Sequence, residues 1–156
     1  MSVKSKKIVM VSGGFDPVHI GHVRLFEEAK KLGDELVVVI NNDNWLRFKK
    51  GFAFMSETDR KEIIESFRFV DRVHITRHDE NTEDISVCRE IELVRPHIFA
   101  NGGDRKQDNI PEYELCQRLG IEMVFNVGDG GKVRSSSELI KEATDKHKTL
   151  KKDAAR

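Results

Sequence analysis

Near the N-terminus, a short apolar run passes through two adjacent glycines into a segment with helical periodicity. The run is Ile8–Val11, the glycines are Gly13 and Gly14, and apolar side chains then recur at helical spacing between Leu25 and Leu32. This order predicts a strand, a tight turn and a helix. The same alternation continues along the chain, which is typical of a parallel sheet covered by helices on both faces. We therefore expect a single α/β domain with a doubly wound sheet of five parallel strands.

The remaining elements follow from the same periodicities. Strands are expected at Ile8–Ser12, Glu35–Ile40, Arg72–Ile75, His97–Ala100 and Glu122–Asn126. Helices are expected at Ile20–Leu32, Glu57–Phe69, Glu83–Val94, Pro111–Leu119 and Ser135–Thr144. Ser56 is a suitable N-cap for the second of these helices. The domain is expected to cover residues 1–144, followed by a lysine-rich tail over residues 145–156 that is flexible or a frayed helix.

Charge and composition narrow the class of protein. The 156 residues include 27 basic and 27 acidic side chains, so the formal net charge is zero. This balance argues against bulk binding to nucleic acid or to an anionic membrane. No apolar run approaches the roughly 20 residues of a membrane span, and no signal-peptide core is present. Only Cys88 and Cys116 could pair, which disfavours a disulfide framework. A cytoplasmic protein is expected.

The segment after the first strand has the features of a phosphate site. Gly13 and Gly14 precede a helix whose first turn carries His19, Gly21 and His22. Helix N-termini attract phosphate through unpaired N–H groups and a partial positive charge. Glycines allow phosphate to approach the backbone, and histidines add donors for charge that develops during transfer. The simpler alternative is that both histidines only cap the helix.

A second glycine-rich turn precedes the last expected helix. Gly130 and Gly131 lead to Arg134 and then to the hydroxyl run Ser135–Ser137. A serine here would cap the helix whatever the function, with Glu138 three residues on. A cation beside consecutive hydroxyls at a helix start also suits an anion site, and the pattern alone leaves both interpretations open.

These two segments resemble the motifs of a known family. Gly14–His22, with the sequence GFDPVHIGH, resembles the HxGH motif of the cytidylyltransferase-like nucleotidyltransferases, which have a Rossmann-like fold. Arg134–Ile140 is similar to that family's second motif, an arginine followed by hydroxyl residues. The resemblance extends over residues 8–142. Within the family, the chain most resembles heptose-phosphate adenylyltransferase domains and glycerol-3-phosphate cytidylyltransferases. Class I aminoacyl-tRNA synthetases carry a related HxGH sequence.

The resemblance implies a reaction and its main participants. A nucleoside monophosphate, CMP or AMP, would pass from CTP or ATP with Mg²⁺ to a small phosphorylated metabolite such as a sugar or polyol phosphate, and pyrophosphate would leave. His19 and His22 would contact the α- and β-phosphates. Lys49 or Lys50, in the loop after the second strand, would reach the triphosphate, and Arg134 would contact it from the second motif. No protein metal site is expected, since no further zinc ligand lies near the histidines.

The same resemblance assigns the binding residues. The nucleotide is expected against Gly14, Phe15, His19, Gly21, His22, Gly102, Gly103, Asp104, Ser135, Ser136 and Ser137. The acceptor is expected near Gly13, Asp16 and Asp43. Many family members have threonine or cysteine where this chain has Gly14, so the resemblance leaves the identity of the acceptor open. The longer second motif typical of cytidylyltransferases is absent. This weakens the case for CTP as the substrate but does not establish ATP.

Other functions compatible with the pattern remain. The chain could be a catalytically silent nucleotide-binding module of the same fold, or an RNA-binding relative of a synthetase core. The intact histidines, lysines and Arg134 favour the enzyme over the module, and the neutral charge disfavours RNA. The resemblance also implies a homo-oligomer. Arg60 resembles an arginine that begins a helix in family members, although a surface salt bridge on that helix is an equal alternative.

Overall fold

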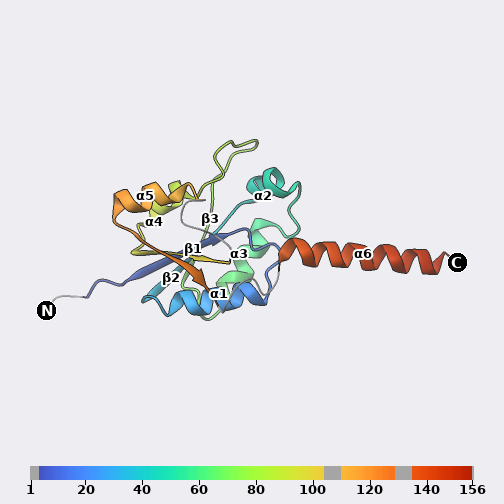
Figure 1. Ribbon diagram of the computed structural model, residues 1–156, viewed down its shortest axis with the longest axis horizontal. Coiled ribbons are helices and arrows are strands. Elements are labelled where there is room, and N and C mark those ends of the chain that lie inside the picture. Colours follow the sequence, from blue (N-terminus) through green and yellow to red (C-terminus); the bar gives the residue numbers. More distant parts are fainter. Residues whose placement is uncertain (1–3, 104–109, 129–134, 156) are drawn as a thin grey trace.

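All five expected strands form and pair in parallel, in the order β3-β2-β1-β4-β5. The computed structural model describes residues 4–103, 110–128 and 135–155. The strands are β1 (Ile8–Gly13), β2 (Glu35–Ile40), β3 (Arg72–Ile75), β4 (Ile98–Gly102) and β5 (Glu122–Val127). The helices are α1 (Ile20–Lys30), α2 (Asp43–Lys50), α3 (Glu57–Glu65), α4 (Cys88–Val94), α5 (Glu112–Leu119) and α6 (Ser136–Ala154). The doubly wound α/β architecture is therefore confirmed (Figure 1).

The strand order locates the edge of the sheet where ligands bind. From β1 the chain winds outward through β2 to β3, then returns to the other side of β1 for β4 and β5. The order therefore reverses between β1 and β4. In such sheets, ligands bind at the carboxyl ends of the strands beside this switch point. The glycine–histidine loop leaves β1 there, and Gly102 and Gly103 end β4 there.

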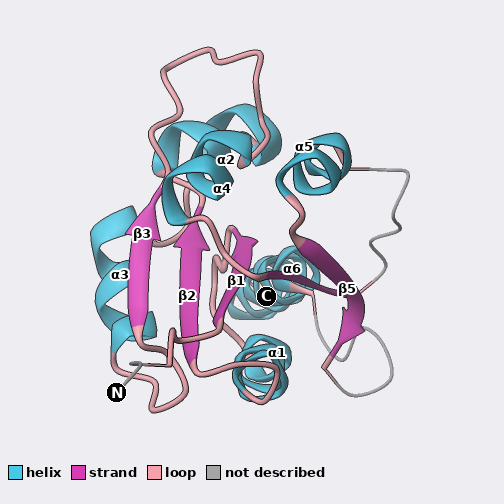
Figure 2. Cartoon of the chain, turned by 90° about the vertical axis from the view of Figure 1, so that its left-hand side faces the viewer, coloured by secondary structure: helices cyan, strands magenta, loops and turns pink. Residues whose placement is uncertain are grey.

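The core consists of two apolar layers, one on each face of the sheet. Side chains alternate between the faces, so Val9 and Val11 of β1 join one cluster with Phe26 of α1 and Ile64 of α3. Met10 joins the opposite cluster, which includes side chains of α4 and α5. Figure 2 shows the corresponding arrangement, with α1 and α3 on one side of the strands and α4 and α5 on the other. Both faces of β1 are thus buried, which holds its carboxyl end rigidly.

One helix was not predicted. The lysine-containing segment after β2 is helix α2 rather than a loop, and Lys49 and Lys50 lie in its last turn. Its N-cap is Asn42, whose side chain accepts a hydrogen bond from Trp45 N at 2.9 Å. Gly51 ends the helix with a φ of 87°, a conformation that glycine adopts without strain. The helix has only eight residues, too few for its periodicity to be read without these caps.

Several boundaries also differ from expectation. Helix α3 ends at Glu65 rather than at Phe69, and α4 begins at Cys88 rather than at Glu83. Before α4, the Asp84 side chain accepts a hydrogen bond from Ser86 N at 2.9 Å, and such local bonds compete with helix formation. Helix α6 continues through the lysine-rich tail and projects from the body of the molecule (Figure 1).

Polar side chains are buried mainly at the carboxyl edge of the sheet. Asp16 follows β1, Asn41 and Asn42 follow β2, Thr76 follows β3, and Asn101 lies at the end of β4. Burying polar groups is unfavourable unless they are hydrogen-bonded, so their concentration at one edge indicates a built site. In the described part of the chain, no helix is both long and apolar enough to cross a membrane.

Candidate active site

The two histidines of the first motif cap helix α1. His19 is the N-cap, and its Nδ1 accepts a hydrogen bond from Gly21 N at 3.1 Å. His22 Nδ1 accepts a hydrogen bond in turn from His19 N at 3.2 Å. The rings stack with centroids 3.7 Å apart. Both histidines therefore cap the helix, as the simpler alternative predicted. Each cap uses only Nδ1 of the ring.

These hydrogen bonds set the tautomer of each neutral ring. A nitrogen that accepts a hydrogen bond carries no proton, so the proton of neutral His19 and of neutral His22 resides on Nε2. Burial, the His19 ring and the Lys50 ammonium together lower the pKa of His22 from 6.5 to about 3. His22 is thus a neutral N–H donor throughout the physiological range. A donor of this kind can stabilise phosphate oxygens without releasing a proton.

Phe15 and Gly13 shape the loop between β1 and α1. The Phe15 ring is buried and meets the rings of His22 and Phe26 edge-on, at centroid distances of 4.9 and 5.2 Å. A Cβ on Gly13 would lie only 2.9 Å from this ring. Gly13 therefore leaves room for Phe15, which in turn supports His22. Gly14 has a different neighbour: a Cβ there would lie 3.1 Å from the buried Leu46 side chain rather than near Phe15.

Asp16 joins the first loop to the segment after α2. Its two carboxylate oxygens accept hydrogen bonds from Phe54 N and Met55 N, both at 2.7 Å. The carboxylate is almost fully buried. Asp16 therefore fixes the backbone of residues 54–55 against the histidine loop. Its assigned contact with the acceptor stays a prediction.

Arg60 is buried, and the expectation of a possible surface salt bridge was wrong. Its guanidinium donates to the carbonyl oxygens of Met55, Gly14 and Asn41 at 3.0, 2.8 and 2.6 Å, and to Asp43 Oδ1 at 2.8 Å. The side chain has no exposed surface. Arg60 thus connects the ends of β1 and β2 with α2 and the following loop. Asp43 was predicted to lie near the acceptor. In the structure it has a structural role, because its carboxylate pairs with Arg60.

The second motif lies against the first. Ser136 is buried, and its Oγ donates a hydrogen bond to the Pro17 carbonyl at 2.8 Å, across 119 residues of sequence. Ser135 is the N-cap of α6, and its Oγ accepts from Glu138 N at 3.4 Å. Ser137, the next residue, is exposed. The starts of α1 and α6 are therefore directly connected. Arg134 and Asp104 lie outside the described residues.

The remaining predicted residues are at the same edge of the sheet. Gly102 packs closely, because a Cβ there would lie 3.1 Å from both the Val127 carbonyl and the Leu25 side chain. Gly103 has a φ of 64° and open space around it. Gly21 lies within the α1 cap, where its N–H bonds His19. Lys49 and Lys50 are both exposed at the end of α2.

A hydrogen-bond network beside the site was not predicted. Asn42 N donates to Thr76 Oγ1 at 2.9 Å, and Asn42 Nδ2 donates to the His78 carbonyl at 2.8 Å. The ring of His78 bonds Thr76 and the Ser86 carbonyl. The network attaches the segment after β3 to the start of α2. The sequence signal that could have indicated it is the Asn41–Asn42 pair after a strand, because asparagine is a favoured N-cap and so marks the start of a helix.

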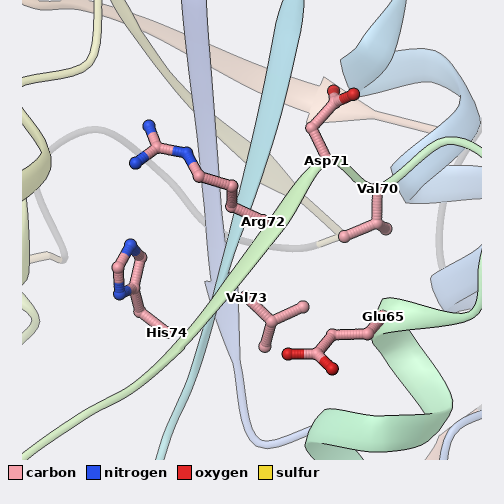
Figure 3. Close-up of a pocket in the computed structure, with 6 residues that line it drawn as sticks. All are labelled: Glu65, Val70, Asp71, Arg72, Val73 and His74. Atoms are coloured by element: carbon pink, nitrogen blue, oxygen red, sulfur yellow. The ribbon is translucent and has the colours of Figure 1, made fainter.

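A separate pocket lies at the outer edge of the sheet. Figure 3 shows its lining, which consists of residues from the end of α3, from β3 and from the segment just before β3: Glu65, Val70, Asp71, Arg72, Val73 and His74. Asp71 is engaged there by Lys30 Nζ at 2.6 Å and by Leu36 N at 2.7 Å. None of the predicted site residues lines this pocket. The candidate site at the carboxyl edge beside β1, where the two motifs meet, is therefore separate from this pocket.

Comparison with known proteins identifies the family of the chain. The model of the cytidylyltransferase-like family matches residues 10–144, and the chain belongs to this family. Its members named below place it among the nucleotidyltransferases, so the protein is an enzyme of that class.

Proteins similar to this chain include an FAD synthase and the bifunctional protein HldE. The chain is 38% identical over 115 residues to an FAD synthase of Aciduliprofundum boonei, covering 74% of this chain and 73% of the relative. It is 33% identical over 141 residues to the bifunctional protein HldE of Desulfatibacillum aliphaticivorans, covering 89% of this chain but only 27% of HldE. A lipopolysaccharide core biosynthesis protein from Thermoplasma volcanium has a similar structure, with a TM-score of 0.66 and 28% identity, covering 81% of this chain and all of that one.

Proposed function

We propose that this protein transfers AMP from ATP to a small phosphorylated metabolite and releases pyrophosphate. The observation that carries the proposal is the hydrogen bond from Ser136 to Pro17, which holds the glycine–histidine loop against the start of α6. ATP is favoured over CTP because the nucleotide half of FAD, the product named for a 38% identical relative, is adenylate. The absence of the longer cytidylyltransferase form of the second motif supports the same choice.

The reaction needs positioning and charge stabilisation rather than a protein nucleophile. An oxygen of the acceptor phosphate attacks the α-phosphorus and forms a new P–O bond. The bond from the α-phosphorus to the bridging oxygen breaks, and its electron pair leaves with pyrophosphate. The acceptor is already an anion, so no general base is required. ATP would enter as its magnesium complex, in which the phosphates carry the ion.

The site residues then have distinct roles. The Nε2–H groups of His19 and His22 would donate to the α- and β-phosphates above the positive end of α1. Lys50 would neutralise charge on the triphosphate, and its influence on the pKa of His22 supports it over Lys49. Arg134 and Ser135–Ser137 would bind from the α6 side. Gly102, Gly103 and Asp104 would border the adenine. Gly13, Asp16 and Asp43 would border the acceptor.

A pyrophosphate-release assay tests this function. The protein is incubated with ATP or CTP and, separately, with phosphorylated sugars, polyols and cofactor precursors. Turnover that requires both ATP and one phosphorylated acceptor is the expected result. Binding of ATP without turnover of any acceptor would identify a silent nucleotide-binding module instead. A preference for CTP would support nucleotidyl transfer and contradict the proposal that ATP is the nucleotide substrate.

A further inference from the structure

A buried carboxylate lies in the loop to which the proposed reaction brings phosphate. Asp16 is only 3% exposed and precedes His19 by three residues. A negative charge close to a bound phosphate repels it, so a carboxylate in this place needs another purpose. Both Asp16 oxygens are engaged by the protein itself, because they accept hydrogen bonds from Phe54 N and Met55 N at 2.7 Å. The carboxylate is therefore turned toward the backbone of the segment after α2.

This segment is held by two buried charged side chains. Met55 N donates to Asp16, and the Met55 carbonyl accepts a hydrogen bond from Arg60 Nε at 3.0 Å. Arg60 also donates to the Gly14 carbonyl at 2.8 Å. Residues 54–55 are thus bonded to the histidine loop directly through Asp16 and indirectly through Arg60. Hydrogen bonds to ionised groups are the stronger kind, so the segment and the loop are held as one unit.

Helix α2 lies between this anchor and a second one. Its start is fixed by the Asn42 cap and by the Trp45 indole, whose Nε1 donates to the Ile85 carbonyl at 2.9 Å. Its last residue is Lys50, and Gly51 then turns the chain with a φ of 87° toward residues 54–55. The backbone of Lys50 is therefore fixed from both sides, which limits how far its exposed ammonium can move.

The anchored lysine acts on the second histidine of the loop. The Lys50 ammonium contributes to the lowered pKa of His22, after burial and the His19 ring. The positive charge of Lys50 is therefore felt at the ring that would donate to the phosphates. A cation at this point suits the triphosphate, provided that the end of α2 keeps its place beside the loop.

We propose that Asp16 is a positioning residue that acts through Lys50. By holding residues 54–55 against the histidine loop, the carboxylate places the Lys50 ammonium where it binds the triphosphate. The inference rests on the proposed function, which gives Lys50 its contact with the triphosphate. Asp16 then borders the acceptor without binding it, and its effect is on the nucleotide.

Binding of inorganic tripolyphosphate, measured by isothermal titration calorimetry, tests this role without turnover. Asp16→Asn offers one acceptor oxygen in place of two, so residues 54–55 lose a bond. It also removes a negative charge, which by Coulomb's law alone would tighten anion binding. We expect about tenfold weaker binding instead, because a displaced Lys50 loses its charged contact. Lys50→Met should also weaken binding about tenfold.

Asp71→Asn is the matched control. The Asp71 carboxylate also accepts two hydrogen bonds, from Leu36 N and from Lys30 Nζ, but it lines the separate pocket at the outer edge of the sheet. This variant should leave tripolyphosphate binding within about twofold of the wild type. If Asp16→Asn melts below the assay temperature, Asp16→Ser replaces it, since serine has no amide NH₂ to face the two backbone N–H groups.

A double-mutant cycle identifies the route. In the Lys50→Met background, Asp16→Asn should change tripolyphosphate binding by less than about twofold, because its effect passes through the missing ammonium. An equal loss in both backgrounds would overturn the inference. Tighter binding by Asp16→Asn, or unchanged binding by Lys50→Met, would overturn it as well.

Steady-state kinetics separate this inference from the proposed reaction. With the best acceptor of the pyrophosphate assay, Asp16→Asn should raise the KM for ATP about tenfold and leave the KM for the acceptor within about twofold. The reverse pattern would support the transferase and assign Asp16 to the acceptor, which overturns the positioning role. Coupling between Asp16 and Lys50 in tripolyphosphate binding, without turnover of any acceptor, would support the positioning role and contradict the transferase proposal.

Discussion

At the scale of single residues, the site combines structural and chemical roles in the same side chains. His19 and His22 each use Nδ1 to cap α1, and in the proposed reaction the same rings would contact the phosphates. Asp16 and Arg60 were singled out in the sequence as motif residues, yet their buried partners could not be predicted. Burial depends on which loops meet at the sheet edge, and periodicity within one segment carries no such information.

Substitution of His19 separates its two roles. Asparagine is a favoured N-cap, so His19→Asn should keep the melting temperature, whereas His19→Ala should lose about 1 kcal/mol of unfolding free energy. Both should reduce kcat by roughly 10²–10³-fold, because both remove the Nε2–H donor. Thermal melts and pyrophosphate release measure the two effects. Normal turnover in both variants would exclude the donor role.

The lowered pKa of His22 predicts a pH dependence of stability. In the unfolded chain this histidine titrates near 6.5, whereas in the folded protein its pKa is about 3. The unfolded state therefore binds more protons as the pH falls below 6.5, and the free energy of unfolding should decrease toward pH 4.5. His22→Asn should show a weaker decrease in urea titrations over this range. NMR of the unliganded wild-type protein should find the His22 ring neutral at pH 5.5. A protonated ring there would contradict the assignment.

Arg60 should be among the most sensitive positions for folding. Arg60→Ala leaves three carbonyl groups and the Asp43 carboxylate without their shared donor. We expect a loss of about 3–5 kcal/mol, typical of breaking a buried ion pair. Lys61→Ala is the control on the same helix, because its pair with Glu65 is exposed and its removal should cost less than about 1 kcal/mol. Similar melting curves for both variants would show that Arg60 is not required for the fold.

At the scale of elements, the strands and helices with clear hydrophobic periodicity were predicted from the sequence. The helix that is marked mainly by its capping residues was missed. The five strands were found because apolar runs alternate with amphipathic segments. Helix α2 was missed although Asn42 and Gly51 mark its ends, because its eight residues make only about two turns and give little periodicity to read.

The contact between α6 and the first loop should matter for activity. Ser136→Ala removes the hydrogen bond to Pro17, which should cost about 1 kcal/mol of stability and lower kcat/KM, since the two motifs lose their direct connection. Thr149→Ala removes an exposed hydroxyl that bonds within the same helix, at Asp145, and should affect neither quantity. Equal effects of both substitutions on turnover would show that the connection does not position the site.

At the scale of the whole molecule, the sheet and the last helix contribute unequally to the fold. Residues 145–154 of α6 are exposed along their length. A chain that stops after Thr144 should therefore melt within about 2 °C of the full chain and keep its turnover. Differential scanning calorimetry and the pyrophosphate assay measure both. A drop of more than about 5 °C, or loss of activity, would assign the tail a structural role.

The contact between Ser136 and Pro17 also has a consequence for biosynthesis. The serine that bonds the histidine loop is 119 residues further along the chain. On the ribosome, the first motif therefore emerges long before its partner, and β4 and β5 must be added on the way. A nascent chain cannot hold the two motifs together until Ser136 has left the ribosome.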